Sequence, residues 1–147
     1  NPGKITIAHP GVGSSPHLTL ELFRLATRID IVPVPYKGAA PALVDLLGGH
    51  LNAMFDNMSS QLAYLKSGRT RPLAVTSPKR TSHLPDVPTM LESGIQVDVT
   101  VWYGLCSPAK TPPAIVSKLN RELVRLLDTP PVIEALARDG ATAVVPR

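Results

Sequence analysis

Three copies of one local pattern fill the first half of the chain: an apolar run, a turn rich in Gly, Pro or Ser, and a helical stretch. The expected strands are residues 4–9, 31–35, 51–55 and 72–76, and the expected helices are residues 15–27, 39–47 and 59–66. Parallel strands need helical crossovers, and this alternation supplies them. The sequence therefore predicts an α/β fold with a mostly parallel sheet flanked by helices.

The sequence pattern changes near residue 78, where prolines and scattered charges replace the regular repeats. Residues 78–94 are expected to form a connection with one helical turn near its end. Beyond it, the sequence predicts a strand at residues 97–105, a long helix starting at residues 111–113, a second helix starting at residue 130, and a short strand at residues 142–145. The second half is thus a strand-helix-helix segment.

The composition suits a folded domain and argues against a nucleic-acid partner and an internal disulfide. Hydrophobic residues make up 44% of the 147 residues, enough for an ordinary core, in which Trp102 and Tyr103 are expected. Lys and Arg number 15 against 11 acidic residues, a net charge of +4 without a basic run, so no nucleic-acid partner is expected. The lone Cys106 excludes an internal disulfide, and its apolar context predicts a buried side chain.

The turn after the first expected strand has the features of an anion-binding site. Gly11 and Gly13 allow positive φ and close approach of a ligand, and Ser14 or Ser15 can cap the following helix. The N–H groups of the first helical turn together carry about half a positive charge, which favours a small anion such as a carboxylate. His17, on the same helix, either donates to a ligand or packs against the protein.

Two further turns are expected beside this one, because the carboxyl ends of parallel strands share one edge of a sheet. The second turn contains Tyr36, Lys37 and Gly38, and Lys37 is either a ligand contact or an exposed tip. The N–H groups of Gly38 and Ala39 are the better ligand candidates there. Asp56, after the third strand, either caps the next helix, which we favour, or accepts hydrogen bonds from a ligand. The three turns predict binding, not catalysis.

Motifs for common enzyme chemistries are incomplete in this sequence. Gly11-x-Gly13 lacks the third glycine of the dinucleotide fingerprint, where Pro16 stands, and neither a P-loop nor a Gly-x-Ser-x-Gly elbow occurs. The histidines lack partners at metal-ligand spacing. We therefore expect no enzyme activity, no metal and no cofactor. A nucleotide-dependent α/β enzyme domain and the effector-sensing domain of a transcription regulator stay open as alternatives.

Several short stretches occur in the same order in one known family. They are residues 1–4, 11–18, 34–38, 41–43, 46–49, 55–57, 73–77, 84–89, 102–105 and 108–112. On these stretches the chain resembles the periplasmic solute-binding receptors of tripartite tricarboxylate transporters, the Bug-type receptors, over essentially its whole length. The resemblance implies a type II periplasmic-binding-protein architecture, in which residues 1–95 form the second lobe and residues 96–147 return to the first lobe.

The resemblance also implies a function. Such a receptor captures a small carboxylated metabolite in the periplasm, either a di- or tricarboxylate or an acidic amino acid, and passes it to transporter membrane subunits. These receptors are about twice this length, so the chain is expected to be a fragment that lacks the N-terminal half of the first lobe. The expected ligand-binding residues are Gly11, Gly13, Ser14, Ser15, His17, Tyr36, Lys37, Gly38, Ala39 and Asp56. The uncovered C-terminal helices are expected to pair two copies of the fragment in a homodimer.

Overall fold

The computed structural model describes residues 3–144 of the chain. The chain divides into two compact units, Asn1–Val101 and Trp102–Arg147. The division lies close to the boundary expected after residue 95, and the assignment of the two parts to lobes stays a prediction.

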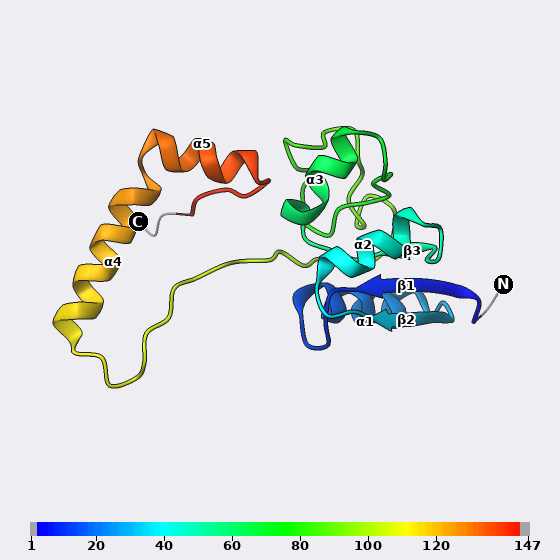
Figure 1. The fold of residues 1–147 in the computed structure, drawn as a ribbon, viewed down its shortest axis with the longest axis horizontal. Helices are drawn as coiled ribbons and strands as arrows, with labels where there is room; N and C mark the ends of the chain where they lie inside the picture. Colours follow the sequence, from blue (N-terminus) through cyan, green and yellow to red (C-terminus); the bar gives the residue numbers. More distant parts are fainter. Residues whose placement is uncertain (1–2, 145–147) are drawn as a thin grey trace. The chain divides into compact units, whose positions relative to one another are not determined.

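The first unit is built on a parallel sheet, as the alternation of strands and helices predicts. Within residues 3–144 the sheet has three strands, in the order β2-β1-β3 (Figure 1). The strands and helices of this unit are β1 (Ile5–His9), α1 (Ser15–Thr27), β2 (Ile31–Pro35), α2 (Ala39–Leu47), β3 (Ala53–Met54) and α3 (Met58–Lys66). The α/β class is thereby confirmed. The expected strand at residues 4–9 begins one residue before β1, and the one at residues 51–55 begins two residues before β3 and ends one residue after it.

Side chains of β1 alternate between two apolar cores on opposite faces of the sheet. Ile7 packs with Leu20 of α1 and with Ile31. The next residue, Ala8, packs with Ala42 of α2 and with Leu51. Successive side chains of a strand point to opposite faces, so one buried strand needs a helix on each side. The sheet therefore holds the N-termini of α1 and α2 at the same edge, beyond the ends of β1 and β2.

Strand β2 lies at one edge of the sheet and carries two prolines. In the register with β1, Pro33 lies opposite Ile7, and Pro35 lies opposite His9. The N–H of Tyr36 donates to the carbonyl of His9, so the alternate residues Pro33 and Pro35 turn their backbone nitrogens to the open side. Proline is tolerated there because no ladder hydrogen bond is lost.

Two expected strands are not formed. Around residues 72–76 the structure has a single parallel bridge between Val75 and Thr89. This ladder cannot extend far, since Pro88 beside Thr89 has no N–H to donate. The strand expected over residues 97–105 is reduced to contacts of Val99 with Thr76, whose carbonyl accepts the Val99 N–H at 2.8 Å. These predictions were wrong because alternating apolar residues indicate an extended segment but do not indicate whether another segment lies beside it to form a sheet.

The second unit contains the two predicted helices, α4 (Pro113–Leu127) and α5 (Pro130–Arg138). Each has a proline in its first turn, where the missing N–H costs no hydrogen bond. The core positions expected for Trp102 and Tyr103 are wrong, as these side chains are 80% and 75% exposed, and Cys106 is also exposed. Their apolar character alone does not determine whether another segment packs on these side chains. Residues 142–144 form no strand, and Val145 lies outside the described residues.

Candidate ligand-binding site

The turn between β1 and α1 is held by its own hydrogen bonds. Ser14, and not Ser15, is the N-cap of α1: its Oγ accepts from the N–H of His17 at 3.4 Å and donates to the carbonyl of Gly11 at 2.7 Å. Gly13 has a φ of +79°, in the left-handed region that favours glycine. The turn therefore presents the N-terminus of α1 at the carboxyl edge of the sheet, where ligands of open α/β sheets bind.

Two histidines contact the backbone of this turn. Nδ1 of His9 lies 3.1 Å from the carbonyl oxygen of Gly11, and because a carbonyl can only accept, we assign the proton to this nitrogen. Nδ1 of His17 accepts the N–H of Gly13 at 3.1 Å. The centroids of the two rings are 4.4 Å apart. His9 is 1% exposed, and this burial lowers the pKa of its imidazole.

The turn between β2 and α2 is joined to the first turn through the backbone. The N–H of Tyr36 donates to the carbonyl of His9 at 3.0 Å, and the N–H of Gly38 donates to the carbonyl of Pro10 at 2.7 Å. Gly38 is the N-cap of α2, with a φ of +114° that residues with a side chain rarely adopt. The structure thus brings two of the expected binding turns together, as the pairing of β1 with β2 requires.

The Tyr36 side chain has a partner that the sequence did not indicate. Its hydroxyl donates to the Asp45 carboxylate of α2 at 2.5 Å, and this hydrogen bond raises the pKa of Tyr36. The contact joins the turn to the helix that follows it. A spacing of nine residues is not a known motif, so no sequence signal points to the pair. Lys37, by contrast, is exposed, as the alternative of an exposed tip predicts.

Some of the expected backbone donors are already used inside the protein. The N–H of Gly13 is bonded to His17, and that of Gly38 is bonded to Pro10. Within residues 3–144, no protein acceptor takes the N–H groups of Ser15, Ala39 and Ala40. These are first-turn donors of α1 and α2, which have no acceptor inside their own helices. The free donors for a ligand are therefore shifted by one or two residues from the glycines.

Asp56 directs its carboxylate to its own segment. Oδ1 accepts from the N–H of Asn57 at 2.8 Å, and Oδ2 accepts from Oγ of Ser60 at 2.6 Å and from Nε2 of Gln61 at 2.9 Å. These contacts hold the start of α3 mainly through the side chains of Ser60 and Gln61. The N-cap itself is Asn57, without a side-chain cap hydrogen bond, so Asp56 does not cap the helix in the way expected. The contacts occupy both carboxylate oxygens, so a role for Asp56 toward a ligand stays a prediction.

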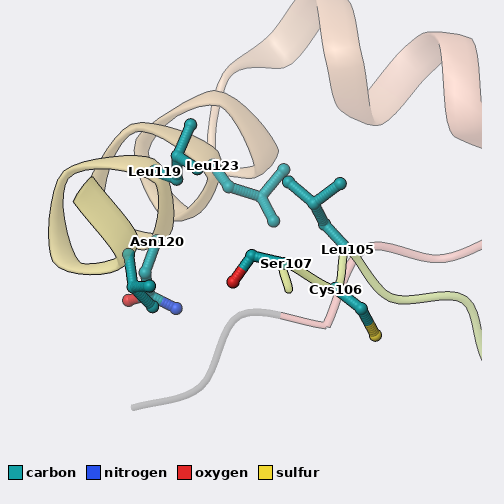
Figure 2. A pocket seen from close by; sticks show the side chains of 7 residues that line it. Leu105, Cys106, Ser107, Leu119, Asn120 and Leu123 are labelled. Carbon is teal, nitrogen blue, oxygen red and sulfur yellow. The ribbon is translucent and has the colours of Figure 1, made fainter. Parts of the chain in front are cut away.

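A separate apolar pocket of about 160 Å³ lies in the second unit. Its lining residues are Leu105, Cys106, Ser107, Val116, Leu119, Asn120 and Leu123. In Figure 2, Leu119 and Leu123 of α4 face the extended segment that carries Leu105, and the sulfur of Cys106 points away from the helix. This lining offers no charged group to a ligand, and the pocket suits an apolar side chain better than a metabolite.

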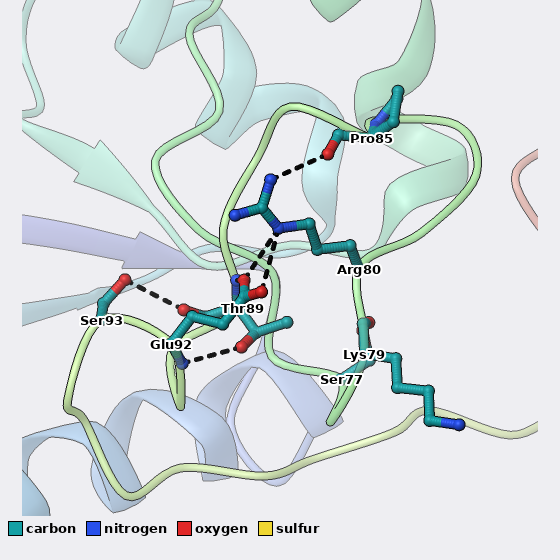
Figure 3. A network of polar contacts seen from close by, with 7 residues as sticks. All are labelled: Ser77, Lys79, Arg80, Pro85, Thr89, Glu92 and Ser93. Carbon is teal, nitrogen blue, oxygen red and sulfur yellow. Dashed lines mark hydrogen bonds and ion pairs between the residues drawn. The ribbon is translucent and has the colours of Figure 1, made fainter.

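A polar network holds the end of the connection in the first unit. Arg80 donates through Nε to both carboxylate oxygens of Glu92, at 3.1 and 2.9 Å, and through Nη1 to the carbonyl of Pro85 (Figure 3). Thr89 and Glu92 form a capping box: the Thr89 N–H donates to Glu92 at 2.7 Å, and the Glu92 N–H donates to Oγ1 of Thr89 at 3.0 Å. Two contacts lower the pKa of the Glu92 carboxyl: the hydrogen bond from the Thr89 N–H has the larger effect, and the ion pair with Arg80 has the smaller one. Thr-x-x-Glu is the sequence signal that would have predicted this structure.

Within residues 3–144, no three His, Cys, Asp or Glu side chains are grouped so that they could hold a metal ion. In the same part of the chain, no helix has the length and apolar character needed to cross a membrane.

The sequence matches a family model along its entire length. The model describes the tripartite tricarboxylate transporter family receptor, TctC, and covers residues 1–147. Among curated relatives, the protein BugT of Bordetella pertussis is 43% identical over 145 residues, which are 98% of this chain and 44% of BugT. The family is one of transporter receptors and not of enzymes, in agreement with the incomplete catalytic motifs.

Solved structures share the fold. R. palustris Rpa4515 with adipate has a TM-score of 0.91 at 35% identity, covering 97% of this chain and 48% of that one. MatC from Rhodopseudomonas palustris with bound malate has a TM-score of 0.87 at 34% identity, covering 99% and 49%. The periplasmic binding protein BugD has a TM-score of 0.85 at 35% identity, with the same coverage as MatC. This chain therefore spans about half the length of BugT and of these three solved proteins.

Proposed function

Because the chain belongs to the tripartite tricarboxylate transporter receptor family, we propose that it is part of a periplasmic receptor that captures a small carboxylated metabolite. The receptor then delivers its ligand to the membrane subunits of the transporter. The observation that carries the proposal is the pairing of two βα turns whose first-turn N–H groups, on Ser15, Ala39 and Ala40, have no acceptor in the described residues.

Backbone donors of this kind suit a carboxylate. The first turn of each helix carries a partial positive charge, and two such turns at neighbouring strands add their fields at one edge of the sheet. Lys37 is exposed in the second turn and adds a full positive charge near the same edge. Binding requires no reactive side chain. Gly13 and Gly38 leave room for a ligand at the two turns, since neither has an atom within 4 Å of an added Cβ.

The ligand class is supported by the solved relatives. The matched structures contain adipate in one case and malate in another, and both molecules carry two carboxylates. A dicarboxylate can place one carboxylate at the turns of this chain and the other elsewhere in the receptor. Tricarboxylates and acidic amino acids share this chemistry and belong in the same test.

The two units fit two parts of a receptor of twice this length. On this proposal residues 1–95 form the second lobe, with the turns as half of the site, and residues 96–147 belong to the first lobe. The coverage of 48% and 49% of the solved chains fits a chain of about half a receptor. The exposed apolar side chains of α4 and α5 would then pack on the remainder of the first lobe.

A thermal-shift screen of the intact receptor tests the proposal. Dicarboxylates, tricarboxylates and acidic amino acids are compared with uncharged amides of the same length. A ligand at 100 times its Kd adds about 2.7 kcal/mol to the free energy of unfolding, which raises the melting temperature by several degrees. Stabilisation by carboxylates and not by the amides is expected. Equal or absent stabilisation by both sets would contradict the proposal.

A further inference from the structure

The N–H of Gly13 has two competing acceptors under the proposed function. In the described structure it donates to Nδ1 of His17 at 3.1 Å. A carboxylate that approaches the turn is the stronger acceptor, since it carries a charge. A neutral imidazole has one acceptor nitrogen, whereas a protonated imidazole has none and donates from both nitrogens. The protonation of His17 therefore decides whether this N–H is bound internally or is available.

We propose that a carboxylate binding at the β1–α1 turn is accompanied by the uptake of one proton by His17, which acts as a positioning residue for the Gly13 N–H. The inference rests on the proposed function of the turn. In the free protein, neutral His17 holds the N–H and keeps the glycine turn ordered. In the bound protein, protonated His17 releases the N–H to the ligand.

The position of His17 in α1 links the two events. It is the third residue of the helix, so a carboxylate bound at the N-terminus of α1 places its negative charge near the ring. That negative charge favours the protonated imidazole over the neutral one. The ligand and the proton therefore favour each other, and this coupling is reciprocal.

The surroundings of His17 permit the charge. From β1, His9 faces it at 4.4 Å between ring centroids, and burial keeps His9 neutral by lowering its pKa. On α1 itself, Glu21 lies one turn further and is paired with Arg24 at 2.9 Å. In the neighbouring turn, the Tyr36 hydroxyl is neutral and bonded to Asp45. None of these groups places an unpaired positive charge beside the ring, and Lys37, which follows Tyr36 in the neighbouring turn, is exposed to solvent.

Proton uptake can be counted by calorimetry. Malate and adipate are titrated into the intact receptor in two buffers that differ in ionisation enthalpy, and the difference in measured heat gives the protons taken up per ligand. Uptake of a large fraction of one proton near neutral pH is expected. The Kd should be about three- to tenfold lower at about pH 6.5 than at about pH 7.5, a range in which carboxylates that titrate near pH 4 remain ionised.

A variant separates protonation from hydrogen bonding. In His17→Asn, the amide oxygen can accept the Gly13 N–H but cannot take up a proton, so uptake and the pH dependence of the Kd should disappear. His50→Gln removes an exposed histidine beyond the other end of α2 and should leave both unchanged. Binding without proton uptake in the wild type, or uptake that survives in His17→Asn, overturns the inference while leaving the proposed function standing.

If the variant does not fold, binding without proton uptake in the wild type still overturns the inference. Circular dichroism of His17→Asn establishes whether its titration can be interpreted. Failure of the wild type to bind any carboxylate overturns the proposed function, and the proton coupling with it.

Discussion

The N–H of Gly38 donates a 2.7 Å hydrogen bond to the carbonyl oxygen of Pro10. This bond joins the turn after β2 to the turn after β1, beyond the last residue pair of the two strands. The ladder therefore continues into the loops, and the N-termini of α1 and α2 are held in a fixed relation. A site made of backbone groups depends on such fixation, because its donors cannot adjust by rotating a side chain.

Substitution of Gly13 should impair binding more than folding. Gly13→Leu places a side chain in open space at the β1–α1 turn, and the carboxylate affinity of the intact receptor should fall at least about tenfold. The strain of a φ of +79° costs about 1–2 kcal/mol of stability. Titration calorimetry measures the affinity.

A matched control for Gly13 exists after α3. Gly68 has a φ of +69° and is equally open, so Gly68→Leu carries a similar strain away from the turns. It should lose stability like Gly13→Leu but keep its affinity. Equal affinities in the two variants would show that the β1–α1 turn does not contact the ligand.

The buried His9 should make the fold sensitive to mild acid. Its pKa is lowered in the folded state, so the unfolded chain binds more protons as the pH falls through about 6.5. The free energy of unfolding is then at its full value above that pH and decreases below it. Urea denaturation between about pH 7.5 and about pH 5.5 should show this decrease, above the range in which carboxylates titrate.

Two variants assign the acid sensitivity to His9. His9→Asn removes the titrating group and should flatten the pH dependence, whatever its effect on stability at neutral pH. His50→Gln, which removes an exposed histidine, should retain the wild-type dependence. A dependence that persists unchanged in His9→Asn would assign it to another group.

The capping box of Thr89 and Glu92 should stabilise the end of the connection. Thr89 is 1% exposed, and Thr89→Val keeps its shape but removes the oxygen that accepts the Glu92 N–H. The loss should be about 1–2 kcal/mol in the free energy of unfolding. Thr100→Val, at an exposed position, should change stability by less than about 0.5 kcal/mol. Equal effects would mean that the hydroxyl of Thr89 contributes nothing.

The apolar face of α4 should cause self-association when the 147 residues are produced alone. Leu119 and Leu123 are 46% and 36% exposed and line the apolar pocket. Light scattering at rising concentration should show a dimer, and Leu119→Glu with Leu123→Glu should restore the monomer. Glu134→Gln with Arg138→Gln on α5 alters charged side chains instead and serves as control. A wild-type chain that stays monomeric at high concentration contradicts the homodimer.

Local sequence patterns predicted the helices and the first two strands because each has a strong local signal. For α1 the capping serine and the apolar spacing agree, and Gly48-Gly49 marks the end of α2. The strands expected at residues 72–76 and 97–105 failed because pairing is a property of two segments. A single sequence shows that Trp102 and Tyr103 are apolar, but their 80% and 75% exposure depends on what lies beside them.

The candidate site was predicted at the level of turns and not of atoms. The carboxyl ends of parallel strands share one edge of a sheet, so the sequence could predict that the turns with Gly13 and Gly38 lie at the same edge. The hydrogen bonds that the N–H groups of Gly13 and Gly38 make inside the protein could not be predicted from the sequence. His17 reaches back four residues to Gly13, and Gly38 bonds across strands to Pro10, and both contacts depend on the exact path of each loop.

The prolines of β2 also determine how this sheet can meet other molecules. At Pro33 and Pro35 the open edge offers carbonyl oxygens but no hydrogens to a passing chain. A polypeptide that tried to add itself alongside would miss two bonds in a row, so stacking of sheets from different copies into fibres is disfavoured. Solutes and partners are therefore expected to contact loop ends and side chains and not the backbone of β2. At high concentration the open edge of β2 does not offer a further strand the hydrogen bonds it would need.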